Sequence, residues 1–414
     1  MSDGSDRLHA LDAVRAFALV LGIFFHATAS FMPTTDKTMM WMIMDAERSP
    51  ALGLTFYVLH IFRMTTFFII AGFFARMLFH RRGLAGFAKD RGKRIALPLV
   101  AGWPIIIVSI IGAIVGGTLI QYGGPPPFGP PPEPPAPPLA FPLTHLWFLY
   151  VLLVFYVLGV AGRAAFVALD RGGGLRSAID GVVAALVRFG LAPLLLAVPA
   201  AIALNAYASW MPWVGIPTPD NSLIPNPPAL AEFGVAFTFG WLLRRQTDLL
   251  AAIQRLWPAY LAAALALTAF GLWQVGLAPT NKTELPGLNR PLYAATYAFA
   301  AWTWSFAFIG MAMRFLSGHS AWRRYLADAS YWLYIVHLPV VILLQGVVAK
   351  YAWPAELKYL LILAVAMPLM LLSYQVMVRY TWLGAILNGK RHPRPARIPA
   401  NSGLSGAAEQ DSAS

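Results

Sequence analysis

The stretch LHALDAVRAFALVLGIFFHATASFM, residues 8–32, is long and apolar enough to cross a membrane as a helix, yet it contains Asp12, Arg15 and His26. A charged side chain inside a bilayer costs on the order of a few kcal/mol, so residues kept there are candidates for function. Arg15 and His26 are eleven positions apart. Eleven steps of ~100° return to almost the same helix face, ~16 Å further along the axis at ~1.5 Å per residue. We therefore predict one helix that presents a guanidinium and an imidazole on a single stripe, at two depths of the membrane.

The composition is that of a protein embedded in lipid. Of the 414 residues, 58% are hydrophobic and 12% are charged, whereas soluble domains carry ~25% charged residues. The first apolar stretch is too long for the core of a signal peptide and lacks a small-residue cleavage site, so we expect it to be retained. The chain has no cysteine, which excludes disulfides, cysteine-ligated metals and thiol nucleophiles.

The basic residues predict the topology. A net charge of +13 would suggest a nucleic-acid partner in a soluble protein, but here Lys and Arg gather in every second loop between apolar segments, so we expect no nucleic acid. The intervening loops are poor in charge, which places both termini in the cytoplasm. We predict an all-α, polytopic membrane helical bundle, each span being about the ~20 residues that a helix needs to cross the hydrocarbon core. The ten predicted spans are residues 9–31, 52–77, 95–119, 143–168, 181–205, 229–245, 254–278, 291–315, 326–349 and 357–386.

Two segments are not expected to be membrane helices. Residues 123–138 read GGPPPFGPPPEPPAPP, and proline lacks the backbone donor that a helix or sheet needs. We expect an extended spacer on the outer face, within a loop over 123–140, or a binding segment for a partner. The tail, 389–414, begins with basic residues and lacks apolar periodicity, so we predict disorder there. Residues 1–388 then form one transmembrane domain.

The first two predicted spans carry an excess of cations. Asp12 either neutralises Arg15, three positions later on the same face, or contacts a substrate. His26 has no carboxylate near it in its own helix and is either catalytic or a packing residue. In the second span His60 and Arg63 share a face, and Arg63 falls near mid-membrane, where it needs a carboxylate, a phosphate or water. The spans hold few acidic residues, so an anionic ligand is favoured over internal pairing.

Each of several further polar and aromatic residues has two possible roles. His145, at the start of the fourth span, belongs to an interfacial belt or to a site. His337, near the middle of the ninth span, is a second acid or base, or a packing residue. Pro339 just after it frees a backbone carbonyl, which is tolerated only where protein or water can satisfy that oxygen. The outer-loop aromatics Tyr122, Trp210 and Trp213 either stack on sugar rings or anchor the interface.

Four motifs, in this order, resemble the acyltransferase 3 family of membrane proteins. Leu11-Asp12 with Arg15, ten residues and His26 resembles the signature of its first span. The segments FRMTTFFIIAGFFARMLFHRRG (62–83), HLWFLYVLLV (145–154) and ASYWLYIVHLPV (329–340) are similar to the branch that succinylates osmoregulated periplasmic glucans. The resemblance covers residue 7 to about residue 388, and the family also has ten spans.

The resemblance implies acyl transfer from cytoplasmic acyl-CoA, as succinyl-CoA or acetyl-CoA, to a hydroxyl of an outer-face carbohydrate, in the inner membrane of a bacterium and in contact with membrane lipid. It implies no bound cofactor, and we predict no metal site. His26 would be the base that takes the hydroxyl proton, and Arg15 would hold a phosphate or the acyl carbonyl of the donor. The predicted catalytic residues are thus His26 and Arg15, and the predicted substrate-binding residues are Asp12, His60, Arg63, His145 and His337.

Two other classes of function stay open on the sequence alone. A transporter or flippase for an anionic lipid-linked sugar would use the same intramembrane cations as a pathway. Transporters of this kind usually show internal repeats with broken helices, and no repeat is apparent here. A sensor or assembly component would instead bind partners through the proline-rich loop, and His26 would then be dispensable.

Overall fold

The computed structural model describes the chain except residues 1, 35–40, 125–137, 390 and 394–414. The prediction of an all-α fold is confirmed, since the described part contains helices and a single isolated β-bridge, Ala140 with Ser222, but no strand. Most of the proline-rich loop and of the tail lies outside the described residues. The helices are α1 (Ser2–Thr28), α2 (Pro50–Arg91), α3 (Leu97–Tyr122), α4 (Trp147–Leu169), α5 (Gly174–Arg188), α6 (Ala192–Ala206), α7 (Pro227–Leu243), α8 (Leu249–Val275), α9 (Arg290–Phe315), α10 (Ala321–Val348), α11 (Ala355–Ser373) and α12 (Trp382–Leu387).

The described helices include six stretches that are long and apolar enough to cross a membrane, or seven if α5 and α6 together form one. The predicted span 181–205 is not one continuous helix, because α5 and α6 meet at a bend of 106°. Gly190 at the bend has φ of 78°, and Pro193 occupies the first turn of α6. A left-handed residue ends one helix and proline starts the next. Each other predicted span contains a helix, while the count of ten crossings stays a prediction.

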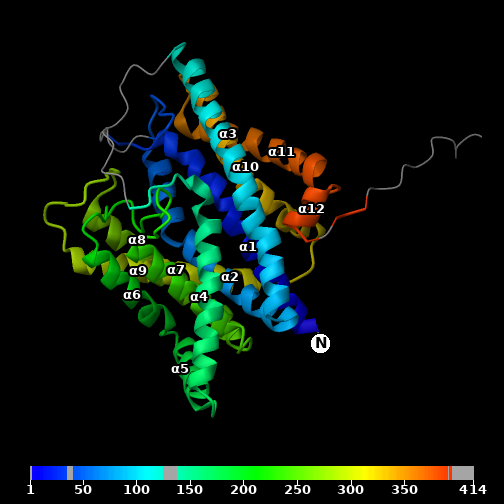
Figure 1. Ribbon diagram of the computed structural model, residues 1–414. Coiled ribbons are helices and arrows are strands. Elements are labelled where there is room, and N and C mark those ends of the chain that lie inside the picture. Colours follow the sequence, from blue (N-terminus) through cyan, green and yellow to red (C-terminus); the bar gives the residue numbers. More distant parts are fainter. Residues whose placement is uncertain (1, 35–40, 125–137, 390, 394–414) are drawn as a thin grey trace, which may run out of the picture.

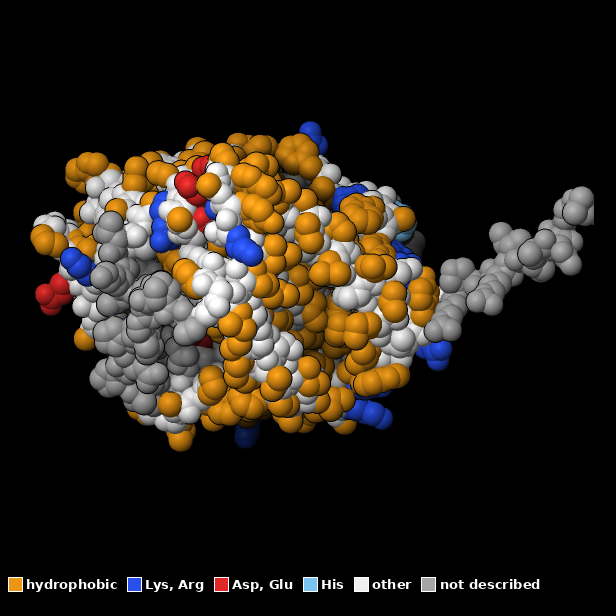
Figure 2. Space-filling view, turned by 90° about the horizontal axis from the view of Figure 1, so that it is seen from above, with side chains coloured by type: hydrophobic (Ala, Val, Ile, Leu, Met, Phe, Trp, Pro, Cys, Tyr) orange, Lys and Arg blue, Asp and Glu red, His pale blue; other side chains and the backbone are white. Residues whose placement is uncertain are grey.

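Apolar side chains cover much of the face shown in Figure 2. On α3, Val100, Ile105 and Val108 are 74%, 67% and 70% exposed. Exposed β-branched side chains in such a row would be unfavourable in water and suit contact with lipid tails. The helix thus fits the multi-pass membrane protein expected from the composition.

Small residues let helices cross closely inside the bundle. A Cβ on Gly72 of α2 would lie 1.9 Å from the Phe237 carbonyl oxygen, and one on Gly240 of α7 would lie 1.8 Å from that of Ile69. Only glycine fits at either position. Without a hydrophobic driving force between helices in lipid, close approach of this kind supplies much of the association energy.

Helices α1 and α10 lie side by side at the centre of the site described below (Figure 1). The loop after α1 is fixed to α11 by a buried ion pair, since the Lys358 Nζ lies 2.7 Å from the Asp45 Oδ1 and both side chains are 1% exposed. Ser49 donates a hydrogen bond to Glu356 from the same loop. These contacts place residues 41–49 over the end of α1.

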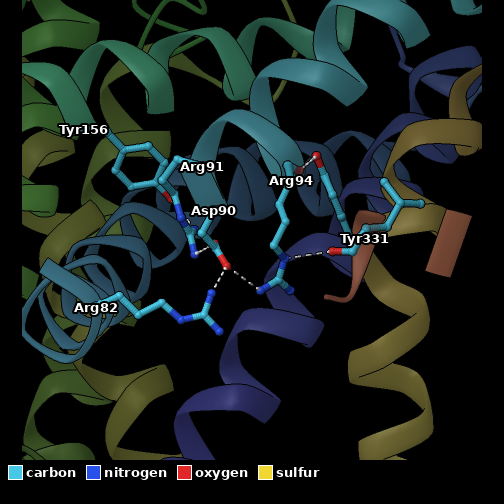
Figure 3. A network of polar contacts seen from close by, with 7 residues as sticks. Arg82, Asp90, Arg91, Arg94, Tyr156 and Tyr331 are labelled. Atoms are coloured by element: carbon cyan, nitrogen blue, oxygen red, sulfur yellow. Dashed lines mark hydrogen bonds and ion pairs between the residues drawn. The ribbon is translucent and has the colours of Figure 1, made fainter. Parts of the chain in front are cut away.

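The long helix α2 turns back at Gly83, whose φ of 68° is outside the helical region. After the turn, Asp90 gathers three guanidinium groups (Figure 3): those of Arg82 at 2.8 Å, Arg91 at 2.7 Å and Arg94 at 3.9 Å. We refer to this group as the Asp90 network. Three basic residues of the loop between the second and third predicted spans are therefore partly neutralised within the protein.

Candidate active site

A small cavity of about 40 Å³ lies between α1, α2, α10 and the start of α4. Water takes up ~30 Å³ per molecule in the liquid, so the space suits the reacting atoms of a substrate rather than a whole sugar. The structure brings together four predicted site residues from four segments of the chain. The lining residues are Ala18, Leu19, Gly22, His26, Arg63, Met64, Phe67, His145, Trp147, Phe148, Tyr334 and His337.

Three imidazole rings form a row beside this cavity. The ring centroids of His26 and His337 are 5.2 Å apart, and those of His337 and His145 are 5.1 Å apart. His337 is 1% exposed and His145 is 7% exposed. Three cationic imidazoles at these separations would repel one another strongly in a medium of low polarity. The row therefore favours neutral rings, which can accept protons.

Backbone carbonyls determine which nitrogen carries the hydrogen on two of these rings. The Nδ1 of His337 is 2.7 Å from the Tyr334 oxygen, and the Nε2 of His145 is 3.0 Å from the Ile335 oxygen. A carbonyl can only accept a hydrogen bond, so each of these nitrogens is the donor. The other nitrogens, Nε2 of His337 and Nδ1 of His145, are buried and have no hydrogen-bond partner among the described residues. Both rings thus keep an open acceptor.

Pro339 explains why the Ile335 oxygen is available. In an α-helix that oxygen would accept from the backbone N–H four residues later, but residue 339 is proline and has none. The His145 ring supplies the missing donor. Tyr334 in turn donates its hydroxyl to the His145 carbonyl. The carbonyl freed by proline is satisfied by protein, as its place inside a membrane helix requires.

His26 differs from its neighbours because no group in the described part of the chain hydrogen-bonds to its ring, and its Nδ1 is buried without a partner. The ring is held by packing instead. The Trp41 indole is stacked on it with centroids 5.6 Å apart and an interplanar angle of 24°, and Phe25 meets it edge-on at 4.9 Å. Gln345 accepts a hydrogen bond from Trp41 and donates one to the His26 carbonyl oxygen at 3.0 Å. The imidazole is fixed in place with its nitrogens uncommitted.

Arg63 is a buried cation without an anion among the described residues. It is 8% exposed, forms no ion pair there, and its Nε has no hydrogen-bond partner. The guanidinium carbon lies 4.4 Å from the Phe25 ring centroid, a favourable cation–π position. A Cβ on Gly22 would come within 3.2 Å of its Nη1, so glycine makes room for the side chain. A group in this state attracts negative charge from a ligand.

The fully buried acid of α7 does not neutralise this cation. Glu232 accepts hydrogen bonds from the Thr65 hydroxyl at 2.8 Å and the Trp302 indole at 3.1 Å. Internal pairing of Arg63 with an acid, the alternative to a ligand in the sequence interpretation, is absent from the described contacts.

His60 lies outside the cavity. Its Nε2 is 3.1 Å from the Ile216 oxygen, and its ring packs 5.3 Å from that of Phe25. It therefore supports Phe25, which contacts both Arg63 and His26. Direct substrate binding by His60 stays a prediction, and the residue is not among those that line the cavity.

Arg15 and Asp12 belong to a second cavity of about 210 Å³ between α1 and the start of α10. Arg15 Nη2 is 3.3 Å from Asp12 Oδ1, and both side chains are partly exposed, at 36% and 44%. Both cavities lie between α1 and α10, so the prediction that Arg15 and His26 share one helix stripe agrees with the structure. The second cavity is lined by His9, Asp12, Ala13, Arg15, Gly318, His319, Ser320, Arg323, Arg324, Ala327 and Asp328.

Some residues were missed or misplaced by sequence reasoning. Trp210 and Trp213 are 0% and 1% exposed, so neither is available to stack on a sugar. Trp41 and Gln345 were missed, although a glutamine within the predicted span 326–349 was a signal. No sequence signal indicated Trp41, because a tryptophan in a loop is usually interpreted as an anchor at the membrane interface. Tyr334 lay within a quoted motif without being singled out.

A scan of protein families matches residues 8–377 to the acyltransferase domain of acyltransferase 3. Among curated proteins, glucans biosynthesis protein C of Escherichia coli strain SMS-3-5 is 34% identical over 161 residues, or 38% of this chain and 39% of that protein. The protein of the same name from Escherichia coli O157:H7 strain EC4115 has the same identity and coverage. The aligned part is thus well under half of these relatives. No solved structure matches the chain. Because the family match extends over most of its length, the chain belongs to the acyltransferase 3 family.

Proposed function

We propose that this protein transfers an acyl group from a coenzyme A thioester, bound from the cytoplasm, to a hydroxyl group of a carbohydrate on the other side of the membrane. The observation that carries the proposal is the pairing of an uncommitted imidazole, His26, with a buried and unpaired guanidinium, Arg63, at one cavity. Acyl transfer to an alcohol needs a base for the hydroxyl proton and a cation for the negative charge of the intermediate.

In the proposed reaction His26 accepts the hydroxyl proton as the sugar oxygen attacks the thioester carbonyl carbon. The negative charge that develops on the carbonyl oxygen lies near the Arg63 guanidinium. The carbon–sulfur bond then breaks, the ester is released, and the coenzyme A thiolate takes the proton from the imidazolium. His337 and His145 are close enough to polarise or relay protons, and each keeps one open ring nitrogen.

The donor's phosphates are assigned to the second cavity. Arg15, Arg323 and Arg324 line it together with two histidines, and guanidinium groups bind phosphate through paired N–H donors. The pantetheine arm would then run along the α1–α10 seam toward His26. The elongated donor thus suits two cavities on one helix stripe.

A glucan is the proposed acceptor. The similar proteins are named for glucan biosynthesis, and a sugar hydroxyl is the nucleophile that the geometry around His26 serves. The acyl group is proposed to be succinyl or acetyl. A succinyl group would add a carboxylate that Arg63 can bind.

The test uses membrane vesicles that hold labelled succinyl-CoA or acetyl-CoA on the face of the Arg15 cavity and glucan on the other face. His26→Ala should lower transfer of label by ~10²–10⁴-fold, the usual contribution of a general base. His80→Ala is the matched control, because His80 is exposed and outside both cavities. Near-normal transfer by His26→Ala, at equal amounts of inserted protein, would refute the assignment. If the parent protein moves lipid-linked sugar but no acyl group, the transporter interpretation replaces the proposal.

A further inference from the structure

A second group of cations, separate from both cavities, lies where α2, α4 and α7 meet. It consists of Arg76, Arg163 and Arg244, and we refer to it as the three-arginine cluster. Arg76 is within electrostatic range of both of the others. The side chains are half-buried, and each guanidinium carbon lies over an aromatic ring. The ring-centroid distances are 5.7 Å for Arg76 over Trp241, 4.9 Å for Arg163 over Phe79 and 5.6 Å for Arg244 over Phe73.

In the described part of the chain the acid within electrostatic range of this cluster is Asp180, and none of the three arginines forms an ion pair with it. Arg76, Arg163 and Arg244 form no ion pair there, and the Nε of Arg244 is buried without a hydrogen-bond partner. The acid close to them, Asp180 of α5, is already bound by Arg245 through Nε at 3.0 Å. Three neighbouring guanidiniums repel one another when they are partly shielded from water. Aromatic rings offset only part of that repulsion.

The Asp90 network provides a comparison within the same protein. There, Arg82, Arg91 and Arg94 converge on one carboxylate, which is 7% exposed (Figure 3). The chain thus places an acid where it concentrates guanidiniums for its own structure. In the three-arginine cluster the nearby acid, Asp180, is instead paired with a fourth residue, Arg245, and no described carboxylate contacts the three guanidiniums, which leaves them able to bind an anion from outside.

The neighbouring helix α5 indicates where that anion comes from. Leu175 and Val182 of α5 and Phe189 directly after it are 52%, 56% and 79% exposed. On the other side, the Asp180 carboxylate accepts from Arg245, and its backbone carbonyl accepts from Gln246 Nε2 at 2.9 Å. A helix with one apolar exposed side and one polar anchored side suits a position at the membrane surface. The cluster therefore lies beside a surface fitted to lipid.

We propose that Arg76, Arg163 and Arg244 form a binding site for a phosphate group, and that the headgroup of an anionic phospholipid supplies it. Paired N–H donors of arginine match the oxygens of a phosphate, and acyl chains would lie against the exposed apolar residues of α5. The proposal does not rest on acyl transfer, since neither cavity contains these arginines.

The experiment measures stabilisation of the purified full-length protein in neutral detergent. Phosphatidylglycerol should raise the midpoint of thermal unfolding, and phosphatidylcholine at equal concentration should not, because a ligand that binds the native state stabilises it. In Arg76→Gln and Arg244→Gln the apparent affinity for phosphatidylglycerol should fall about tenfold per variant, the loss expected for one charge-assisted contact. Arg82→Gln is the matched control, since it removes a guanidinium that has its own carboxylate.

Two further arms separate the sources of phosphate and the effects of folding. Inorganic pyrophosphate replaces the lipid in one arm; stabilisation by pyrophosphate that is lost in Arg76→Gln would keep the phosphate site and overturn the lipid as its source. Arg76→Lys keeps the charge and loses paired donors, so weaker binding with an unchanged unfolding midpoint without lipid supports the geometry. Equal responses to phosphatidylglycerol in the parent, Arg76→Gln and Arg82→Gln, or no response in any of them, would overturn the proposal.

Discussion

The two cavities along α1 differ in size and in the charged residues that line them. The cavity around His26 is small and lined mainly by buried side chains, and its described lining contains histidines and Arg63 but no carboxylate. The cavity around Arg15 is larger and more polar, and its lining includes arginines together with Asp12 and Asp328. A space lined by buried, weakly polar groups strengthens electrostatic effects on reacting atoms, whereas a space lined by partly exposed groups screens them. The first is therefore suited to chemistry and the second to holding a charged part of a substrate.

The difference between the two cavities is tested most directly by removing the cation of the His26 cavity. Arg63→Leu should lower the turnover rate by ~10²–10³-fold, the usual loss when a donor to a developing oxyanion is removed. The measurement is acyl transfer at saturating donor and acceptor, with folding checked by gel filtration. The variant should lose succinyl transfer more than acetyl transfer if Arg63 also binds the distal carboxylate. Equal losses would restrict it to the oxyanion, and full activity would remove it from the mechanism.

A smaller and different effect is expected at the Arg15 cavity. Arg15→Gln should raise the KM for acyl-CoA about tenfold and leave the turnover rate nearly unchanged, because one charge-assisted contact to a phosphate is lost before the reaction begins. Initial rates over a range of donor concentrations distinguish the two parameters. A fall in turnover rate without a change in KM would place Arg15 at the reacting carbonyl. The two cavities would then no longer have separate roles in catalysis and donor binding.

The smallest effect is expected from the proline that frees the Ile335 oxygen. Pro339→Ala restores a backbone N–H that competes with His145 for this oxygen, so transfer should fall about fivefold, the equivalent of one neutral hydrogen bond. The double variant with His145→Ala should show no additional loss from Pro339→Ala. Independent, multiplying losses would mean that the proline acts through helix shape rather than through the His145 ring.

The sequence predicted the helices that form the site better than the contacts between them. His26, Arg63 and His337 could be singled out because a polar residue in an apolar run is conspicuous at any position. That His145 would donate to the carbonyl freed by Pro339 could not be predicted, since it depends on which helices pack together. Glu232 shows the same limit, because its partners Thr65 and Trp302 come from distant parts of the chain.

Loops were predicted least well. Two tryptophans in a predicted outer loop are typical of an exposed aromatic patch. In the structure, however, the side chains of Trp210 and Trp213 are buried. Trp41 is the opposite case, since a loop residue reaches the His26 ring. Helical periodicity says nothing about either, because loop positions follow tertiary contacts rather than a repeat.

The ion pair of Asp45 with Lys358 has a consequence for biosynthesis. The two residues are separated by most of the chain, and a domain is made from its amino end at ~5–20 residues per second. The Asp45 carboxylate therefore cannot form its ion pair until the segment that contains Lys358 has left the ribosome and entered the bundle. A polypeptide truncated before Lys358 would contain every residue assigned to the His26 cavity but would leave a carboxylate without its cation, a costly defect in a buried place. The late part of synthesis that supplies Lys358 thus decides whether the loop that carries Trp41 is fixed to the bundle.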